Sequence, residues 1–267
     1  MTEQAQRFLE LHRQDRPLLL PNPWDAGSAK LLVSLGFQAL ATTSSGAAAS
    51  LGELDGALGR ERTLAGAARI VAATELPVSA DLENGLAADS AGVAETVRRA
   101  AQVGLAGCSI EDSSGDPERP IYELAEAVER VTAAAEAARG EQRIVLTARA
   151  ENHLHGREDL DDTIARLQAY ETAGADVLYA PGLIELEQIR RVVESVSLPV
   201  NVLAHPGVPS VERLAAVGVK RVSVGGAFAF AALGAVVEAA KELSDDGTYG
   251  FWERAGVGVR AARAAFA

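Results

Sequence analysis

The chain alternates short apolar runs with longer stretches in which apolar residues recur every three to four positions. Eight such runs, each bounded by turn-forming residues, predict β-strands at 18–21, 39–43, 78–82, 107–110, 144–148, 177–180, 200–204 and 221–224. The intervening stretches, such as 90–103 and 160–173, are rich in Ala, Glu, Leu and Arg and have the helical period. Eight alternating strand and helix units predict an α/β fold, a (β/α)8 TIM barrel.

Glycine and proline positions support the same division of the chain. A glycine stands where each of four predicted helices would end, at Gly36, Gly104, Gly174 and Gly218. Glycine suits the left-handed cap that ends a helix. The rival fold is an open doubly wound sheet, which would carry a glycine-rich dinucleotide fingerprint after the first strand. Residues 21–24 read Pro-Asn-Pro-Trp instead, so the barrel is favoured.

Both ends of the chain extend beyond the eight units. Residues 2–14 predict an extra amphipathic helix, with Phe8, Leu9 and Leu11 on one side. After the eighth strand, a helical tail at about 227–267 is more helix than a minimal barrel needs. We therefore predict one barrel domain over the whole chain, with a tail that offers a surface for self-association.

Composition narrows the class of protein. A net charge of −12 disfavours nucleic acid or an anionic membrane surface as a partner. No apolar run approaches the roughly 18 residues of a membrane span, and the first residues lack the apolar segment of a secretory signal. We therefore expect a cytoplasmic protein. The single cysteine, Cys108, excludes an internal disulfide framework, and its place in an apolar run indicates a small buried residue.

Charged residues follow directly on three neighbouring apolar runs. Asp81 and Glu83 close the third run, Glu111 and Asp112 the fourth, and Arg149 the fifth. In a parallel barrel these strand ends meet at one face, where charge belongs if something binds it. Four carboxylates without a His or Cys cluster favour Mg²⁺ or Mn²⁺. The alternative is that the acids cap the helices that follow them.

An arginine and a hydroxyl-rich segment would make this face an anion site as well. The guanidinium fork of Arg149 suits a carboxylate or a developing oxyanion. The alternative is a structural ion pair with Glu151 or Glu111. Residues 42–46 read Thr-Thr-Ser-Ser-Gly and offer hydroxyl and backbone N–H groups. This last signal is weak, because such residues are common in any turn.

Taken in order, these motifs resemble the isocitrate lyase and phosphoenolpyruvate mutase superfamily, with a phosphonomutase-like member as the nearest type. The resemblance covers nearly the whole chain and is carried by residues 21–25, 42–46, 51–55, 80–85, 110–112 and 148–149. It implies a modified barrel whose last helix is exchanged between subunits, and hence a homodimer or homotetramer. It also implies a small anionic 2-oxo or 2-hydroxy acid as substrate, with chemistry beside a pyruvate-enolate-like species.

The predicted site residues fall into three sets. By motif position, the resemblance makes Asp81 the direct Mg²⁺ ligand, with its waters held by Asp55, Glu83 and Glu111. The predicted substrate-binding residues are Trp24, Thr43, Ser44, Ser45, Gly46, Arg149 and Asn201. The predicted catalytic residues are Arg149, Asp55, Glu111 and His205. The metal and the arginine would stabilise negative charge on the enolate oxygen.

The chain departs from the family pattern in the loop after the fourth strand. Lyases that split isocitrate or methylisocitrate carry a Lys-Lys-Cys-Gly-His loop there, whose cysteine acts as general acid. Residues 112–120 of this chain contain no Cys, Lys or His, and the Lys and Asn of the phosphonate mutases are missing too. The acid or base is therefore open among Tyr179, His205, Glu151 and His153. His205 is the best placed for proton transfer near neutral pH, and a structural role is its alternative.

We expect a Mg²⁺-dependent lyase that cleaves a C–C bond in a small 2-oxo or 2-hydroxy (di)carboxylic acid, decarboxylase and hydrolase variants included. One alternative is a phosphonate P–C bond mutase or hydrolase, and another is a catalytically impaired keto-acid binding protein. A Schiff-base aldolase is disfavoured, because Lys30, Lys220 and Lys241 fall on predicted helices or before a strand.

Overall fold

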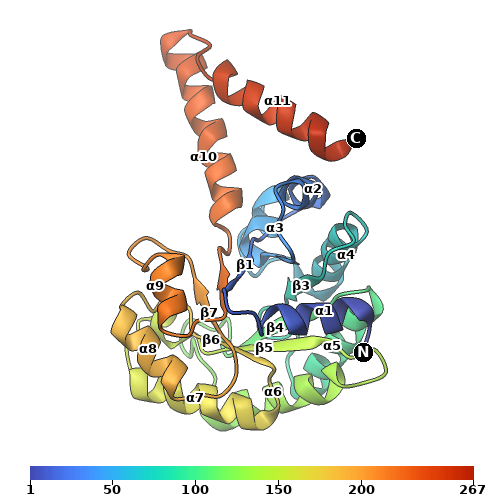
Figure 1. Cartoon of the computed structure of the whole chain (residues 1–267), viewed down its shortest axis with the longest axis vertical. Coiled ribbons are helices and arrows are strands. Elements are labelled where there is room, and N and C mark those ends of the chain that lie inside the picture. Colours follow the sequence, from blue (N-terminus) through green and yellow to red (C-terminus); the bar gives the residue numbers. More distant parts are fainter.

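Eight parallel strands form an almost closed barrel surrounded by helices (Figure 1) in the computed structural model, which describes all 267 residues. The strands are β1 (Leu18–Leu20), β2 (Leu40–Ala41), β3 (Val78–Asp81), β4 (Gly107–Glu111), β5 (Val145–Arg149), β6 (Val177–Tyr179), β7 (Val200–Leu203) and β8 (Arg221–Ser223). β1 pairs with β8, and each other strand pairs with its neighbour in sequence from β2 to β8. One hydrogen bond, from Ala41 N to Pro21 O at 3.1 Å, links β1 and β2. The predicted (β/α)8 barrel is confirmed.

Helices lie between the strands on the outside of the barrel. They are α2 (Ala26–Ser34), α3 (Ser44–Ser50), α4 (Gly59–Val71), α5 (Ser90–Gln102), α6 (Leu124–Ala138), α7 (Leu160–Ala173), α8 (Leu186–Glu194) and α9 (Val211–Ala216). Their buried faces and the outward faces of the strands form one apolar cluster of 40 residues, many of them Ala and Val. Burial of each Val or Leu contributes about 1.5–3 kcal/mol, so this layer holds the strand ends in fixed positions.

The predicted N-terminal helix closes the amino-terminal end of the barrel. In α1 (Glu3–Leu11), Phe8 and Leu11 are buried, and they join a second apolar cluster with the first residues of several strands. Gly107 begins β4, and a Cβ built there would lie 2.9 Å from the Phe8 ring. Glycine is therefore required for this close approach. The amino end of the barrel is packed, so an open site belongs at the carboxyl end.

The predicted glycine caps are present. Gly174 ends α7 with φ of 107°, a left-handed conformation that favours glycine. The other three predicted cap positions also have positive φ, at Gly36, Gly104 and Gly218. Each helix therefore stops in time for the next strand to return to the barrel.

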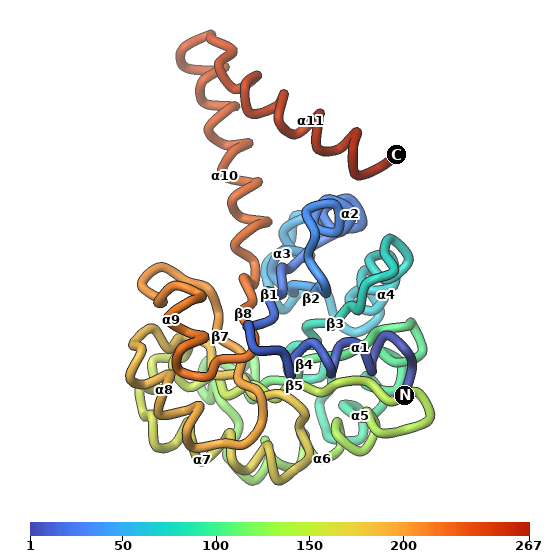
Figure 2. Tube along the Cα trace, in the orientation of Figure 1, coloured from blue at the N-terminus to red at the C-terminus, as the bar shows by residue number.

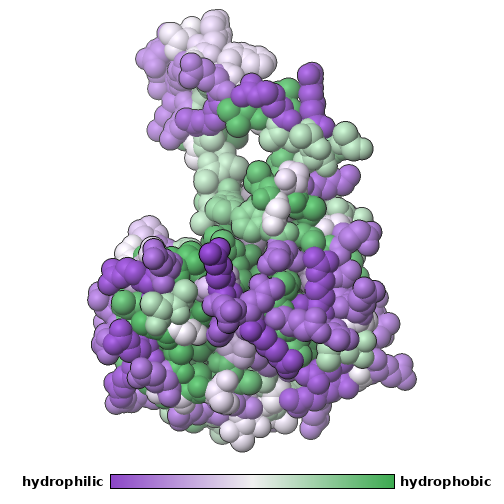
Figure 3. Space-filling model, viewed as in Figure 1, coloured by the Kyte–Doolittle hydropathy of each residue, from purple (hydrophilic) through white to green (hydrophobic).

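The C-terminal tail forms an arm that leaves the barrel. α10 (Ala227–Lys241) runs outward after β8, a π-helical turn follows at Glu242–Asp246, and α11 (Trp252–Phe266) turns back toward α2 (Figure 2). In Figure 3 the stem of the arm is largely pale green, whereas the barrel below carries more purple surface. The exposed apolar side chains of the arm include Phe230, Val236, Val237, Trp252 and Val257. None of the helices is both long enough and apolar enough to cross a membrane.

Candidate active site

A cavity of about 140 Å³ opens at the carboxyl ends of the strands, inside the ring that they form. Every strand, or the residue next to it, contributes to its wall: Leu20, Ala41, Asp81, Ser109, Arg149, Tyr179, Leu203 and Ser223. The lining also contains Thr43, Ser44, Ser45, Asp55 and Arg221. A cavity this small and this polar suits a ligand of few atoms with several charged or hydrogen-bonding groups.

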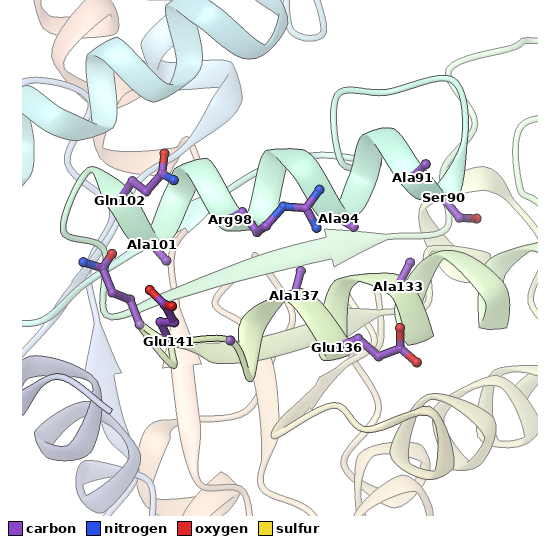
Figure 4. Close-up of a pocket in the computed structure, with 12 residues that line it drawn as sticks. Ser90, Ala91, Ala94, Arg98, Ala101, Gln102, Ala133, Glu136, Ala137 and Glu141 are labelled. Atoms are coloured by element: carbon purple, nitrogen blue, oxygen red, sulfur yellow. The ribbon is translucent and has the colours of Figure 1, made fainter.

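A larger groove of about 690 Å³ lies elsewhere, on the outside of the barrel between α5 and α6 (Figure 4). Alanine side chains line much of it, including Ala91, Ala94, Ala133 and Ala137. Its charged residues are Arg98 and Glu136, on helix surfaces, and Glu141, in the connection after α6, and none of them lies at the carboxyl end of a strand. The charged cavity of the barrel, and not this groove, is therefore the candidate active site.

Arg149 lies at the centre of the charged cavity and binds three carboxylates. Its Nη1 is 3.0 Å from Asp81 Oδ1 and 3.0 Å from Glu111 Oε2, and its Nε donates to Glu151 Oε1 at 2.9 Å. The register of β4 and β5 places Glu111 directly beside Arg149. Burial opposes a charged guanidinium, yet the carboxylates hold the pKa of Arg149 well above its usual range. The ion pairs with Glu111 and Glu151, expected as alternatives to ligand binding, are both present.

Two further acidic side chains, Glu83 and Asp55, give this centre more carboxyl groups than one guanidinium can balance. Burial, Asp81 and Asp55 raise the pKa of Glu83 to about 7, while Arg149 acts in the opposite direction. Burial also raises the pKa of Glu111 well above its usual range, against the effect of Arg149. Arg149 pairs directly with three of these carboxyl groups, and a bound cation would favour the charged form of the others.

Glu83 reaches this centre by a different route from the one expected. Two residues on a flat strand share a face, and this reasoning placed Glu83 with Asp81. The strand ends at Asp81, and Glu83 has φ of 51°, in the left-handed region that few side chains adopt. A hydrogen bond from Gly85 N to Leu82 O at 2.8 Å closes the tight turn. The turn, rather than the strand, therefore sets the position of the second carboxylate.

The donor set fits a hard cation held partly through water. All the acidic groups offer oxygen, which Mg²⁺ and Mn²⁺ prefer. Asp81 Oδ2 accepts from Ser44 Oγ at 3.1 Å, and Asp81 Oδ1 faces Arg149. No three Asp, Glu, His or Cys side chains stand in a direct metal-binding arrangement. This spacing is compatible with Mg²⁺, which keeps several of its waters and takes one or two carboxylates directly.

The hydroxyl-rich segment after β2 places three of its predicted residues in the cavity: Thr43, Ser44 and Ser45. Thr43 is the N-cap of α3, and its Oγ1 lies 3.3 Å from Gly46 N and 3.2 Å from Ser45 Oγ. The Gly46 N–H is therefore used by the cap. A Cβ on Gly46 would lie 3.0 Å from Ala229 Cβ, so this glycine serves the packing of the arm on the barrel.

Trp24 and Asn201 lie outside the charged cavity. Trp24 lines an adjoining cavity of about 280 Å³, whose wall also includes Thr43, Ser44 and Asp81. Asn201 is buried in β7, and both ends of its amide are engaged. Its Nδ2 donates to Ser223 Oγ at 2.9 Å, and its Oδ1 accepts from Arg221 Nε at 2.9 Å.

Asp112 points away from the site. Neighbouring residues of a strand face opposite sides, so Asp112 lies on the outer side of the barrel when Glu111 faces Arg149. Its Oδ2 accepts from Arg166 Nη1 at 3.0 Å and from the Tyr170 hydroxyl at 2.6 Å. Its Oδ1 accepts from Glu151 N at 2.8 Å. Asp112 was grouped with the other acids of the site, and this grouping was wrong.

The residues considered for proton transfer are dispersed. His205 is exposed on the loop after β7, with Nδ1 3.1 Å from Pro206 O, and His153 lies on the loop after β5. Neither histidine is among the residues that line the charged cavity. Tyr179 does line it, and its ring lies below Arg149 Cζ at 5.1 Å, a cation–π contact.

Sequence reasoning missed Arg221 and Ser223 of β8. Both line the cavity, and Arg221 is only 4 % exposed. The sequence did contain a signal for Arg221, because it is a charged residue at the start of an otherwise apolar run. A charge buried in a strand requires polar partners around it.

A (β/α)8 barrel with a charged cavity at its strand ends defines the class as a barrel enzyme. The family model described as phosphoenolpyruvate phosphomutase matches residues 8–244. The chain is 34% identical over 246 residues to an uncharacterized protein of Mycobacterium tuberculosis, covering 89% of each. It is 32% identical over 209 residues to 2-methylisocitrate lyase of Shewanella oneidensis, covering 75% of this chain and 70% of the lyase.

A crystal structure of a candidate lyase/mutase from Burkholderia cenocepacia superposes with a TM-score of 0.91 and 53% identity, covering 94% of this chain and 91% of that one. The chain belongs to the isocitrate lyase and phosphoenolpyruvate mutase superfamily. The resemblance inferred from the sequence motifs is thereby confirmed. The protein is an enzyme, and its relatives in this superfamily include lyases.

Proposed function

We propose that this protein is a Mg²⁺-dependent lyase that cleaves a C–C bond in a small 2-oxo or 2-hydroxy (di)carboxylic acid through a pyruvate-enolate-like intermediate. The proposal rests chiefly on the Arg149 centre, where one guanidinium pairs with Asp81, Glu111 and Glu151 beside a cavity of about 140 Å³. Asp55 and Glu83 add two more acidic groups next to Asp81. An anionic substrate would be repelled by this excess of acids. A bound cation would reverse that effect, so the site favours a metal and an anion together.

Relatives support the substrate class. Among the related enzymes is an oxaloacetate decarboxylase of Pseudomonas entomophila, 32% identical over 179 residues. A structure of oxaloacetate acetylhydrolase in complex with the product oxalate has a TM-score of 0.84 and 26% identity. Both enzymes are named for a small 2-oxo dicarboxylate, which agrees with the size and charge of the cavity.

In this proposal Asp81 holds the metal directly, and its waters are held by Asp55, Glu83 and Glu111. When bound, the metal supplies Lewis-acid stabilisation of the charge that develops on the enolate oxygen. Arg149 donates to the same oxygen. The substrate carboxylate is held by Thr43, Ser44 and Ser45. Asn201 would act from outside the cavity through its hydrogen bonds to Ser223 and Arg221, and Trp24 through the adjoining cavity that it lines. Two groups compete for proton transfer, namely His205 and Tyr179.

A second candidate function is a phosphonate P–C bond mutase or hydrolase. The description of the matching family model, phosphoenolpyruvate phosphomutase, favours it. Phosphorus NMR of phosphonopyruvate separates the two, because a P–C enzyme changes the spectrum and a C–C lyase leaves it unchanged. A keto-acid binding protein would bind substrates without turning any of them over.

We also propose that the arm of α10 and α11 is exchanged between subunits of a homodimer or homotetramer. The exposed Trp252 and Val236 support this, since large apolar side chains are costly to leave in water. Light scattering of the whole chain would give the subunit number.

Calorimetric titration of oxalate, a mimic of the pyruvate enolate, tests the proposed function. We expect binding with Mg²⁺ present and none without it. Asp81→Asn should lose the binding, whereas Asp161→Asn, an exposed change on α7, should keep it. Absence of binding by the unaltered protein under both conditions would contradict the proposal.

A further inference from the structure

Tyr179 and two residues of β8 form one wall of the charged cavity. Tyr179 ends β6, and Arg221 and Ser223 begin and end β8. The Ser223 hydroxyl lies beside the phenol and acts to lower its pKa. Arg149 lies over the face of the same ring. The Ser223 hydroxyl and the Arg149 guanidinium thus lie next to the phenol, and Arg221 lines the same cavity.

Arg221 has no carboxylate within ion-pair distance. Its Nε donates to Asn201 at 2.9 Å, and its Nη1 lies 3.0 Å from Thr147 Oγ1 and 3.3 Å from His12 Nε2. Burial and Arg221 lower the pKa of His12 to about 3, so this ring is neutral. Its Nδ1 donates to Phe8 O, which leaves Nε2 as an acceptor for Arg221. All three partners of Arg221 are therefore uncharged.

A buried charge without a counter-ion is costly to keep. Burial lowers the pKa of Arg221 to about 10, and the side chain still carries its charge at neutral pH. The Nη2 group of Arg221 forms no hydrogen bond with the protein. A positive charge is thus held beside the cavity, where a negative charge that forms during the reaction would compensate it.

Tyr179 is the one titratable residue of the cavity lining that is neither a predicted metal ligand nor an arginine. The other titratable residues of the lining are Asp55, Asp81, Arg149 and Arg221. Burial raises the pKa of Tyr179 to about 12, so the phenol keeps its proton at rest. The ring is 7 % exposed, which excludes most water from it.

We propose that Tyr179 transfers the proton to and from the enolate carbon, and that Arg221 stabilises the phenolate that results. The assignment rests on the proposed lyase function. When the C3–C4 bond of a 2-oxo acid breaks, the C4 fragment leaves without the electron pair, as carbon dioxide does in a decarboxylation. The pair forms the C2–C3 double bond, and the charge moves to the C2 oxygen. The phenol O–H bond then breaks as the C3–H bond forms, and the C2 carbonyl returns. The phenolate takes a proton from solvent water, which restores the enzyme.

Hydrogen exchange into pyruvate tests this assignment without knowledge of the true substrate. In deuterated water with Mg²⁺, the unaltered protein should exchange the C3 protons of pyruvate, followed by proton NMR. Tyr179→Phe should lower the exchange rate by about 100-fold or more, the usual range for a lost general acid–base group. Its oxalate binding should remain within about threefold of the unaltered protein, because the Arg149 centre is intact.

His205→Gln is the competing variant, since His205 is the alternative proton-transfer group. An exchange rate that falls in His205→Gln and persists in Tyr179→Phe would overturn the assignment while leaving the lyase proposal standing. Absence of both oxalate binding and exchange in the unaltered protein would refute the lyase proposal, and the assignment with it.

Arg221 is tested as a positioning residue by two variants. Arg221→Met should lower the exchange rate by about 10-fold or more and leave the apparent pyruvate affinity nearly unchanged. Arg221→Lys keeps a positive charge and should recover part of the rate. Equal rates in the two variants would show that the charge of Arg221 has no part in proton transfer.

Discussion

Two arginines, the part-buried Arg149 and the buried Arg166, each bind more than one carboxylate, yet their surroundings differ. Arg149 lines the cavity and pairs with three carboxylates, Asp81, Glu111 and Glu151, none of which has a second cation as partner. Arg166, on α7, binds Asp112 and Asp162, and Arg157 also pairs with Asp162 at 3.4 Å. The second cluster therefore balances two acids with two guanidiniums.

The two clusters also differ in their hydrogen bonds and in the pKa values of their carboxyl groups. Around Arg166, the remaining contacts are supplied by the Tyr170 hydroxyl, the Tyr122 carbonyl and the Asn152 amide. Around Arg149, several carboxylates have raised pKa values because burial and neighbouring acids disfavour their charge. The same residue types thus build a closed structural network in one place and an open, unbalanced site in the other. Charge balance and access to a cavity distinguish them.

The largest expected effect is the loss of function in Asp81→Ala. Removal of the proposed direct ligand should lower Mg²⁺-dependent oxalate affinity and turnover by more than about 100-fold, beyond what supporting residues of metal sites lose. Asp161→Ala, an exposed aspartate change, is the matched control. Calorimetry and a coupled assay would measure both. Retained metal-dependent turnover would contradict the role given to Asp81.

Arg166→Met should damage stability instead. It leaves Asp112 buried without its cation, and the broken pair should lower the free energy of unfolding by about 3–5 kcal/mol. Urea denaturation followed by circular dichroism measures this. A loss below 1 kcal/mol would mean that the Arg166 cluster is no more important than a surface ion pair.

The unbalanced cluster should make the metal-free protein sensitive to pH. The pKa of Glu83 is about 7 in the folded state, against 4.5 as its ordinary value. The folded state therefore holds the proton over this window, and stability should fall as pH rises from 4.5 through 7. Thermal unfolding in chelator measures the slope. Glu83→Gln should flatten it, and Mg²⁺ should also reduce it; an unchanged slope in Glu83→Gln would contradict this origin.

The smallest expected effect is that of Arg191→Met. Arg191 pairs with Asp161, and both side chains are exposed. Exposed pairs contribute about 0–1 kcal/mol, so the free energy of unfolding should barely change. The same urea measurement provides the comparison with Arg166→Met. Similar losses in the two variants would remove the contrast between buried and exposed pairs.

The barrel could be predicted because its signals are local. Apolar runs, helical periods and capping glycines such as Gly174 each depend on a few neighbouring residues, and the strands begin and end within two residues of the expected positions. Strand-end acids could be predicted for the same reason. Which face of the barrel a strand-end side chain occupies depends on its exact position in the strand. The sequence did not give that position to one residue, and Asp112 was therefore placed in the site with Glu111.

The polar wall from β6 and β8 could not be predicted. Arg221 meets Asn201, Thr147 and His12 only after the barrel closes, and no spacing along the chain encodes that meeting. His205 attracted attention because its ordinary pKa lies near neutrality. Tyr179 gives no such signal in the sequence, and its position became apparent from the cavity that it lines.

The contact between α1 and β8 also bears on how the chain is made. His12 and Arg221 are 209 residues apart, and the strand ladder of β1 is formed with β8, whereas one hydrogen bond links β1 to β2. During synthesis, the first strand and the first helix must wait on the ribosome until nearly the whole barrel has emerged. Their apolar surface stays exposed during that interval, and pairings this distant in sequence form slowly. The start of the chain is therefore among the last parts to reach its final place.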